Sequence, residues 1–270
     1  MNFLDSLILG GLQGVTEFLP ISSSGHLVIV EKFLGLDVEN LKSFDVIVHM
    51  GTLLAILVYF WNDVKGMIMA CGRFCVGKLE FSDRYAKLIL FLIIGTIPAV
   101  ALGIFGDALD AHFRNVKSVG ILMLAVAFVF LLAEFIYKKT AQKKSEVTKW
   151  HQALIIGLAQ AFALIPGISR SGSTISAGLF QGIERSSAAR FSFLLGIPAI
   201  VGAGLLTGLK ISENGGIDIS AGVLFTGFLS SFLFGLLSVY FLMKFLKKHT
   251  LIVFAVYRIA LAVFIFSYFL

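Results

Sequence analysis

The sequence predicts an all-α membrane protein with six transmembrane helices and two re-entrant helix-loop-helix hairpins, arranged as an inverted-topology repeat. Three observations predict this fold class: an apolar composition, six apolar runs of membrane-spanning length, and two further apolar runs that are interrupted in the middle. Hydrophobic residues make up 58% of the 270 positions and charged residues 14%, against about 25% charged in soluble domains. Mean hydropathy is +0.94. This composition excludes a soluble globule and a disordered, collagenous or disulfide-rich secreted chain.

The six uninterrupted runs, each of about 20 residues, match a hydrocarbon core of about 30 Å. The expected spans are Phe44–Trp61, Leu88–Gly106, Val119–Tyr137, Phe191–Leu209, Ile219–Met243 and Leu251–Leu270. The first residues, Met1–Leu12, have no basic region and carry Asp5. We therefore expect them to belong to the mature protein and not to a cleaved signal peptide.

The two interrupted runs are Phe3–Leu36 and Trp150–Gly182. Each contains Pro, Gly and Ser in its middle, at Pro20–Gly25 and Pro166–Gly172, so each half is too short to cross comfortably. Irregular backbone at membrane depth is tolerated where it lines a protein cavity. Both runs are therefore expected to form re-entrant hairpins.

Lysine and arginine predict the orientation, because basic loops stay in the cytoplasm. The expected cytoplasmic segments are Asn62–Lys87, Lys138–Lys149 and the cluster Lys244, Lys247 and Lys248; the expected outer loops are Asp107–Lys117 and Lys210–Asp218. With these assignments the first hairpin enters from outside and the second from the cytoplasm. The net charge of +6 is spread over these short clusters and forms no stripe, so we expect no nucleic-acid partner.

The two hairpins also resemble each other in sequence. Gly11-Leu12 and Pro20 align with Gly157-Leu158 and Pro166, and after a one-residue insertion Ser22, Ser24 and Gly25 align with Ser169, Ser171 and Gly172. Each hairpin precedes three expected spans. We therefore divide the single membrane domain into a first repeat, residues 1–137, and a second repeat, residues 138–270.

The first hairpin carries polar residues where a lipid environment disfavours them. Gln13 and Glu17 share one helix face. An ionisable group at this depth indicates function, unless Glu17 is a structural carboxylate paired across helices or the hairpin is shallow enough to leave it hydrated. Ser22 and Ser23 lie where a helix restarts, which suits either an N-cap or a phosphate site. His26 lies one turn after Ser23 and could exchange a proton with it.

The second hairpin supplies a cation, Arg170, in a segment without acidic residues from Trp150 to Ile183. A guanidinium suits phosphate oxygens, and the flanking hydroxyls are those of Ser169, Ser171, Ser173 and Thr174. The alternative is that Arg170 only pairs with Glu17 of the other hairpin. That pair would still bring the two tips to one site.

Other polar residues carry weaker signals. His49 and Glu134 are expected to satisfy helix–helix hydrogen bonds, Arg258 to snorkel or face the bundle, and Glu184, Arg185 and Arg190 to lie in a solvated loop. Cys71 and Cys75 are expected to be free thiols. Nucleotide-binding and clustered metal-ligand motifs are missing from the sequence, so we expect no organic cofactor.

Two segments resemble one known family. The stretch from Gln13 to His26, QGVTEFLPISSSGH, and the stretch from Pro166 to Thr174, PGISRSGST, are similar to the undecaprenyl-diphosphate phosphatases of the bacitracin-resistance type. The resemblance implies a multi-pass enzyme of the bacterial inner membrane that removes the terminal phosphate of undecaprenyl diphosphate. Its product carries precursors for peptidoglycan synthesis, and its activity confers bacitracin resistance.

The resemblance and the residues together give a set of hypotheses. Glu17, Ser23, His26 and Arg170 are expected to be catalytic, and the expected substrate-binding residues are Gln13, Ser22, Ser169, Ser171, Ser173 and Thr174. Attack by Ser23 and direct attack by water both remain open. Either Glu17 or His26 could take the Ser23 proton, and the other would then orient Ser23 or protonate the leaving phosphate. A Mg²⁺ or Ca²⁺ ion at Glu17 and Gln13 is an option, although the family often has Glu where this chain has Gln13, and an amide holds a divalent cation less firmly.

A rival hypothesis is a transporter that flips polyprenyl phosphate, because broken helices in inverted repeats also bind anions at the membrane midplane. It would need Arg170 but no reactive Ser23 or His26. The expected partners are a polyprenyl diphosphate and membrane lipid, and a homo-oligomer is compatible with the sequence.

Overall fold

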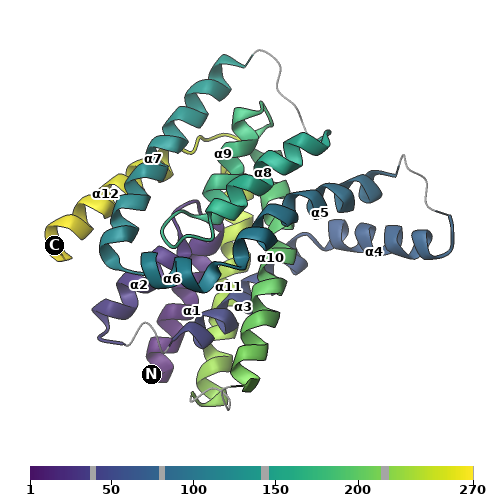
Figure 1. Cartoon of the computed structure of the whole chain (residues 1–270). Coiled ribbons are helices and arrows are strands. Elements are labelled where there is room, and N and C mark those ends of the chain that lie inside the picture. Colours follow the sequence, from purple (N-terminus) through teal and green to yellow (C-terminus); the bar gives the residue numbers. More distant parts are fainter. Residues whose placement is uncertain (37–40, 79–82, 141–145, 214–218, 270) are drawn as a thin grey trace.

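The computed structural model describes residues 1–36, 41–78, 83–140, 146–213 and 219–269, and within these ranges the chain forms helices and no strand (Figure 1). The all-α prediction is confirmed. In chain order the helices are α1 Phe3–Phe18, α2 Ser23–Phe33, α3 Lys42–Tyr59, α4 Trp61–Cys75, α5 Arg84–Gly103, α6 Gly106–Phe113, α7 Val116–Lys139, α8 Trp150–Phe162, α9 Arg170–Phe180, α10 Arg185–Glu213, α11 Ala221–Phe245 and α12 Ile252–Phe269.

Five helices of the described chain are long and apolar enough to cross a membrane: α5, α7, α10 over Arg185–Leu209, α11 and α12. The pair α3 and α4 adds a sixth candidate if the two helices count as one bent span. The expected spans overlap these helices. Residues 79–82, 141–145 and 214–218, which belong to expected loops, and Leu270 lie outside the described residues.

Two expected loops contain helices, which corrects the sequence analysis. The segment Asn62–Lys87 was expected to be a loop, but most of it forms α4, which is bent by 81° from α3. Gly66 and Ala70 make a small buried face on α4, and the ring of Tyr85 from α5 packs against Gly66. Cys71 and Cys75 are exposed on α4 and are free thiols, as expected. The segment Asp107–Lys117 likewise contains most of α6.

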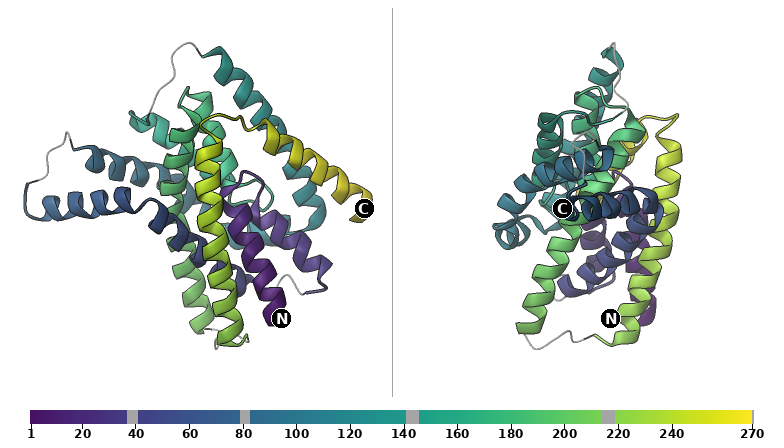
Figure 2. Two further views of the ribbon diagram at one scale, coloured as in Figure 1. Left: turned by 180° about the vertical axis from the view of Figure 1, so that it is seen from behind. Right: turned by 90° about the vertical axis from the view of Figure 1, so that its right-hand side faces the viewer.

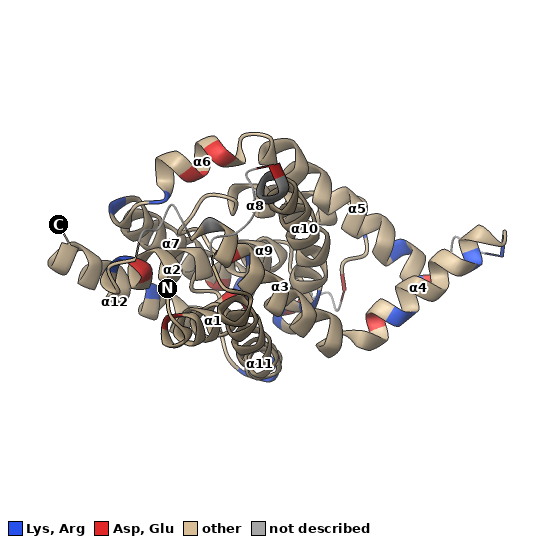
Figure 3. Cartoon of the chain, turned by 90° about the horizontal axis from the view of Figure 1, so that it is seen from below, with Lys and Arg blue, Asp and Glu red and all other residues tan. Residues whose placement is uncertain are grey.

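Helices α4 and α5 lie side by side and project from the bundle on the side away from the C-terminus (Figure 2). Viewed from below, charged residues gather on α4, on α6 and near helix ends, while long stretches of the other helices carry none (Figure 3). Charge is thus kept away from most of the apolar surface, as a lipid solvent requires.

Each hairpin packs tightly on a helix from the other half of the chain. Helix α1 packs on α11, where a Cβ at Gly10 would collide with the backbone of Gly227. Helix α8 packs on α5, where a Cβ at Gly157 would collide with the backbone of Gly95. Glycine at these contacts lets the backbones approach closely, as is common between membrane helices.

The two hairpin tips have the same backbone conformation at one serine each. Ser22 and Ser169 have φ values of 75° and 77°, and in the described chain they are the non-glycine residues with positive φ. Each serine caps the following helix, because its hydroxyl accepts a hydrogen bond from the backbone N–H three residues later, at Gly25 or Gly172. Both helices that follow, α2 and α9, are 11 residues long.

Candidate active site

Glu17 lies where the two hairpin tips meet. Its Oε1 accepts a hydrogen bond of 2.7 Å from Nη2 of Arg170, which belongs to the other hairpin. Its Oε2 accepts hydrogen bonds of 2.6 Å from Ser23 Oγ and 3.2 Å from Gln13 Nε2. The Glu17 side chain is 7% exposed and that of Arg170 14%. Four residues singled out from the sequence therefore share one buried cluster.

The break in the first hairpin makes this arrangement possible. Leu19 adopts an extended backbone before Pro20, which disfavours helix at the preceding residue, so α1 ends after Phe18. The chain then turns, and Ser23 at the start of α2 reaches back to Glu17 in the last turn of α1. Arg170 is the first residue of α9. Helices α2 and α9 thus both begin at the tips, and the N-terminus of a helix favours a bound negative charge.

Helix α10 holds Arg170 from the other side. Arg170 Nη1 donates a hydrogen bond of 3.1 Å to the backbone carbonyl of Ser192, and the Ser192 hydroxyl lies 2.5 Å from that of Thr174. A Cβ at Gly196 would collide with the guanidinium. Ser192 and Gly196 were not predicted from the sequence to belong to the site. Their signal was a pair of small residues spaced i, i+4 in an apolar span, which often marks a close helix contact.

Three of the predicted serines have structural partners in the tips. Ser171 Oγ donates a hydrogen bond of 3.3 Å to the carbonyl of Leu19, which joins the second tip to the first. Ser22 and Ser169 cap α2 and α9. Ser173 is half-buried in α9, one residue before Thr174. The hydroxyls therefore line both tips, and most of them also fix the backbone around Glu17 and Arg170.

This cluster combines a carboxylate, a hydroxyl that donates to it, and a guanidinium. A carboxylate in this position can accept the hydroxyl proton as the oxygen attacks an electrophile. A guanidinium can bind phosphate oxygens and stabilise the charge that develops on them. The arrangement suits phosphoryl transfer.

The comparisons with known proteins agree with this chemistry. The model of a family described as bacitracin resistance protein BacA matches residues 6–264. The chain belongs to the BacA family. Proteins named undecaprenyl-diphosphatase are similar to it: that of Methanosphaera stadtmanae is 44% identical over 95% of this chain and 94% of that protein. Those of Chloroherpeton thalassium and Thermomicrobium roseum are 37% and 42% identical, over 99% and 97% of this chain and 96% of each relative.

Family membership and the apolar helices together make this BacA-family chain a multi-pass protein of the inner membrane. The family resemblance stated from the two hairpin segments is thereby confirmed, and the match covers nearly the whole chain.

In this BacA-family protein the ring nitrogens of His26 bond to residues other than Ser23. Its Nδ1 lies 2.7 Å from the carbonyl oxygen of Ser22, and its Nε2 lies 2.7 Å from the hydroxyl of Tyr257 on α12, whose ring stacks on the imidazole. Both ring nitrogens are therefore occupied. Helical spacing alone predicted His26 beside Ser23, and it could not reveal Tyr257, which is distant in the sequence.

A different histidine faces the carboxylate. His49 Nε2 lies 3.7 Å from Glu17 Oε2, and its Nδ1 donates to the backbone carbonyl of Asp45 at 2.6 Å. From the sequence, His49 was expected only to satisfy a helix–helix hydrogen bond. Its position on α3, next to α1, brings it to the cluster instead.

Three other predictions about charged residues have a clear outcome. The prediction of a solvated loop at Glu184, Arg185 and Arg190 is wrong for both arginines, because they lie in α10. Arg185 pairs with Glu134 and Arg190 with Asp63, each through two nitrogens. Glu134 therefore bonds between helices, as expected.

Arg258 faces the bundle, which was one of its two expected positions. It is 0% exposed and donates hydrogen bonds to the carbonyls of Gly167 at 2.8 Å and Met123 at 3.1 Å. It thus ties the second tip to α7.

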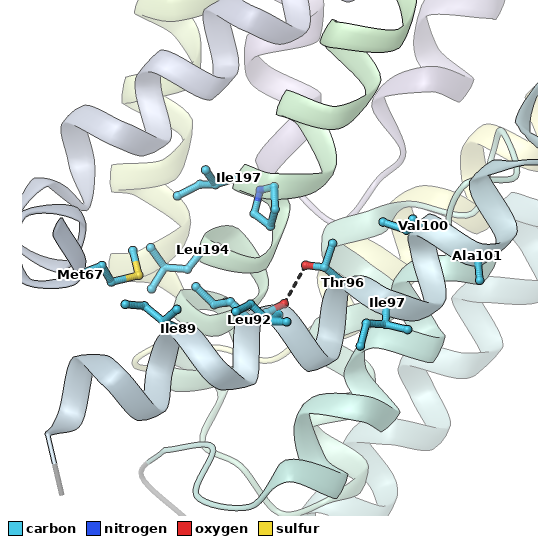
Figure 4. Close-up of a pocket in the computed structure, with 11 residues that line it drawn as sticks. Met67, Ile89, Leu92, Thr96, Ile97, Val100, Ala101, Leu194 and Ile197 are labelled. Atoms are coloured by element: carbon cyan, nitrogen blue, oxygen red, sulfur yellow. Dashed lines mark hydrogen bonds between the residues drawn. The ribbon is translucent and has the colours of Figure 1, made fainter. Parts of the chain in front are cut away.

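An apolar cavity of about 580 Å³ lies between α4, α5 and α10 (Figure 4). On α10 it is lined by Leu194, Ile197 and Pro198, whereas Ser192 and Gly196 of the same helix contact Thr174 and Arg170. The cavity is therefore separated from the cluster by α10. Its one hydroxyl, that of Thr96, is bonded to the Leu92 carbonyl, so the lining suits hydrocarbon chains and not a diphosphate.

Proposed function

We propose that this chain hydrolyses undecaprenyl diphosphate to undecaprenyl phosphate and inorganic phosphate, at the cluster where the two hairpin tips meet. The observation that carries the proposal is the bonding of Glu17 to both Ser23 and Arg170. Family membership and the names of the three relatives support it, since all three are named for hydrolysis of this lipid and none for transport. The flippase hypothesis gains no such support.

The proposed architecture has six spans and two re-entrant hairpins, with residues 1–137 and 138–270 as inverted repeats. The shared positive φ and the shared cap at Ser22 and Ser169 support it. So does the pairing of helices, because α1 packs on α11 as α8 packs on α5. In this arrangement the diphosphate enters between the tips, while its polyprenyl chain stays among the apolar helices.

Ser23 is the proposed nucleophile. Its Oγ forms a bond to the terminal phosphorus as the bond from that phosphorus to the bridging oxygen breaks, and undecaprenyl phosphate leaves. The hydroxyl proton passes to Glu17, which lies 2.6 Å away. Water then cleaves the phosphoserine, which releases inorganic phosphate and restores the hydroxyl. Direct attack by water with Glu17 as base is the alternative, and it forms no phosphoserine.

Arg170 is proposed to bind the phosphates and neutralise the charge that develops during transfer. The N-termini of α2 and α9 assist it, and so do the hydroxyls of Ser22, Ser169, Ser171, Ser173 and Thr174. His26 is assigned a positioning role in place of proton exchange, because its bonds to Ser22 and Tyr257 hold the first tip against α12.

A divalent cation would be held by Glu17 and Gln13. The Gln13 Oε1 atom is buried and has no hydrogen-bond partner, which fits an oxygen ligand. In the described chain no three acidic, histidine or cysteine side chains gather to hold a metal, so phosphate oxygens would have to supply further ligands. When bound, Mg²⁺ or Ca²⁺ would offset phosphate charge.

The test is release of inorganic phosphate from undecaprenyl diphosphate by the purified protein in detergent, with and without Mg²⁺ or Ca²⁺. We expect release by the wild type, with Ser23→Ala and Arg170→Ala both inactive and a phosphoserine at Ser23 trapped by acid quench. Absence of release under every cation condition would overturn the phosphatase. Activity that survives Ser23→Ala but not Arg170→Ala would replace Ser23 with water as the nucleophile.

A further inference from the structure

A basic cavity lies apart from the proposed active site. It has a volume of about 290 Å³ and opens between the first turns of α5 and α10 and the segment that leads into α8. Its lining includes three basic side chains, Arg84, Lys87 and Arg190, and one carboxylate, that of Glu146. We call it the basic cleft after the three cations. None of its lining residues belongs to the cluster around Glu17.

The ion pairs leave positive charge in the basic cleft. Arg84 pairs with Glu146 at 2.5 Å, but these side chains are 61% and 45% exposed, and an exposed pair contributes little to stability. Arg190 uses two of its three nitrogens for Asp63. Lys87 is exposed and has no carboxylate within ion-pair distance in the described chain. An anion in the cleft would therefore meet an unpaired ammonium and a weakly held guanidinium.

Neighbouring residues place the basic cleft at the level of lipid head groups. Trp150 begins α8, two residues after Thr148 in the lining, and is 60% exposed. Exposed tryptophan next to lysine, here Lys149, is typical of the membrane–water interface. The inner wall is apolar, since Phe91 and Phe191 line it and are 9% and 4% exposed. The cleft thus combines exposed basic side chains with a buried aromatic wall.

We propose that the basic cleft binds the phosphate head group of an anionic glycerophospholipid from the cytoplasmic leaflet. Lys87 and Arg84 contact the phosphate, and the acyl chains leave along the apolar wall. Basic pockets between membrane helices on the cytoplasmic side have this chemistry in general. The site is independent of the proposed hydrolysis. Its bound lipid would join the starts of α5 and α10 to the segment that leads into α8, the first helix of the second hairpin.

The two tryptophans of the chain allow a local measurement. Trp61→Phe leaves Trp150 beside the basic cleft as the single tryptophan. In this background, quenching by phosphatidylglycerol with brominated chains is compared with quenching by brominated phosphatidylcholine. We expect the anionic lipid to bind about tenfold more tightly, the value of one charge-assisted hydrogen bond. Lys87→Ala should remove this preference.

Lys138→Ala is the matched control, because Lys138 is an exposed lysine near the end of α7 and does not line the cleft. It should keep the preference, and all variants should keep the wild-type unfolding temperature in detergent. Equal quenching by the two lipids overturns the proposal, as does an equal effect of Lys87→Ala and Lys138→Ala. Binding of inorganic phosphate by the wild type but not by Lys87→Ala, with equal quenching by the two lipids, would assign the cleft to free phosphate and would also overturn the proposal.

Discussion

The two hairpin tips have the same backbone and different side chains. Both turn at a serine with positive φ that caps the following helix, yet the first tip presents Ser23 where the second presents Arg170 as the first residue of the next helix. The first tip also has a carboxylate, Glu17, in the helix before it. The repeated backbone therefore brings the two tips together in the same conformation. The differences in side chains place a negative charge, Glu17, in one hairpin and a positive charge, Arg170, in the other, so that the two charges pair between the tips.

The surroundings of the two tips also differ. Glu17 receives hydrogen bonds mainly from its own hairpin, from Gln13 and Ser23. Arg170 is held by α10, through the Ser192 carbonyl and the space left by Gly196. The acid is thus fixed locally and the cation by a distant span, so mutations should affect the two charges by different routes.

The largest effect is expected from Glu17→Gln. The change keeps the shape but removes the proton acceptor and the negative partner of Arg170, so phosphate release should fall by about 10³-fold. Glu134→Gln is the matched control, because Glu134 is also a buried glutamate in an ion pair, in this case with Arg185. It should lower the unfolding temperature and leave the rate per folded molecule near that of the wild type. A Glu17→Gln enzyme within tenfold of wild type would contradict the assignment.

Gly196→Ala should come next. The added methyl group displaces the guanidinium of Arg170 without deleting it, and a shift of this kind should lower kcat/KM by about 10²-fold. Gly202→Ala, in the same helix, is the control because a Cβ there meets no neighbouring atom within 4 Å. If both variants have the same activity, α10 does not position Arg170.

A smaller effect is expected from Ser171→Ala, which removes the hydrogen bond from the second tip to the Leu19 carbonyl of the first. Loss of one such bond should reduce activity about fivefold. Ser24 occupies the corresponding place in the first tip, and its hydroxyl contacts only Ser22 of its own hairpin among the described residues. Ser24→Ala should therefore be nearly neutral, and equal losses would show that the tips are joined symmetrically.

The smallest effect is expected from Ser22→Gly and Ser169→Gly. Glycine removes the cost of positive φ, about 1 kcal/mol, and loses a few tenths of a kcal/mol of capping. Each variant should raise stability by less than about 1 kcal/mol, measured as a small rise in the unfolding temperature. A rise for one serine and a fall for the other would break the equivalence of the two backbones.

The sequence predicted the parts of the molecule that depend on local pattern. Apolar runs gave the long helices, and Pro20 and Pro166 marked the two tips. Glu17 and Arg170 stood out because a charge in an apolar run is costly, which is a local signal.

Contacts between distant segments could not be predicted in this way. Ser192, Tyr257 and His49 look ordinary within their own spans, and their roles depend on which helices pack together. Helix α4 was missed for a related reason: its polar residues suggested a loop, whereas the small face at Gly66 and Ala70 needs Tyr85 of α5 to be recognised.

The close approach of Gly10 to Gly227 has a consequence for biosynthesis. Helix α1 leaves the ribosome well before its partner α11, because helices α2 to α10 lie between them in the chain. Until α11 is inserted, the first hairpin lacks the helix surface on which it packs, so Glu17 is not yet held in its final position. The active site can therefore form only after α11 has been inserted, and a chain truncated before α11 should be degraded by membrane quality control.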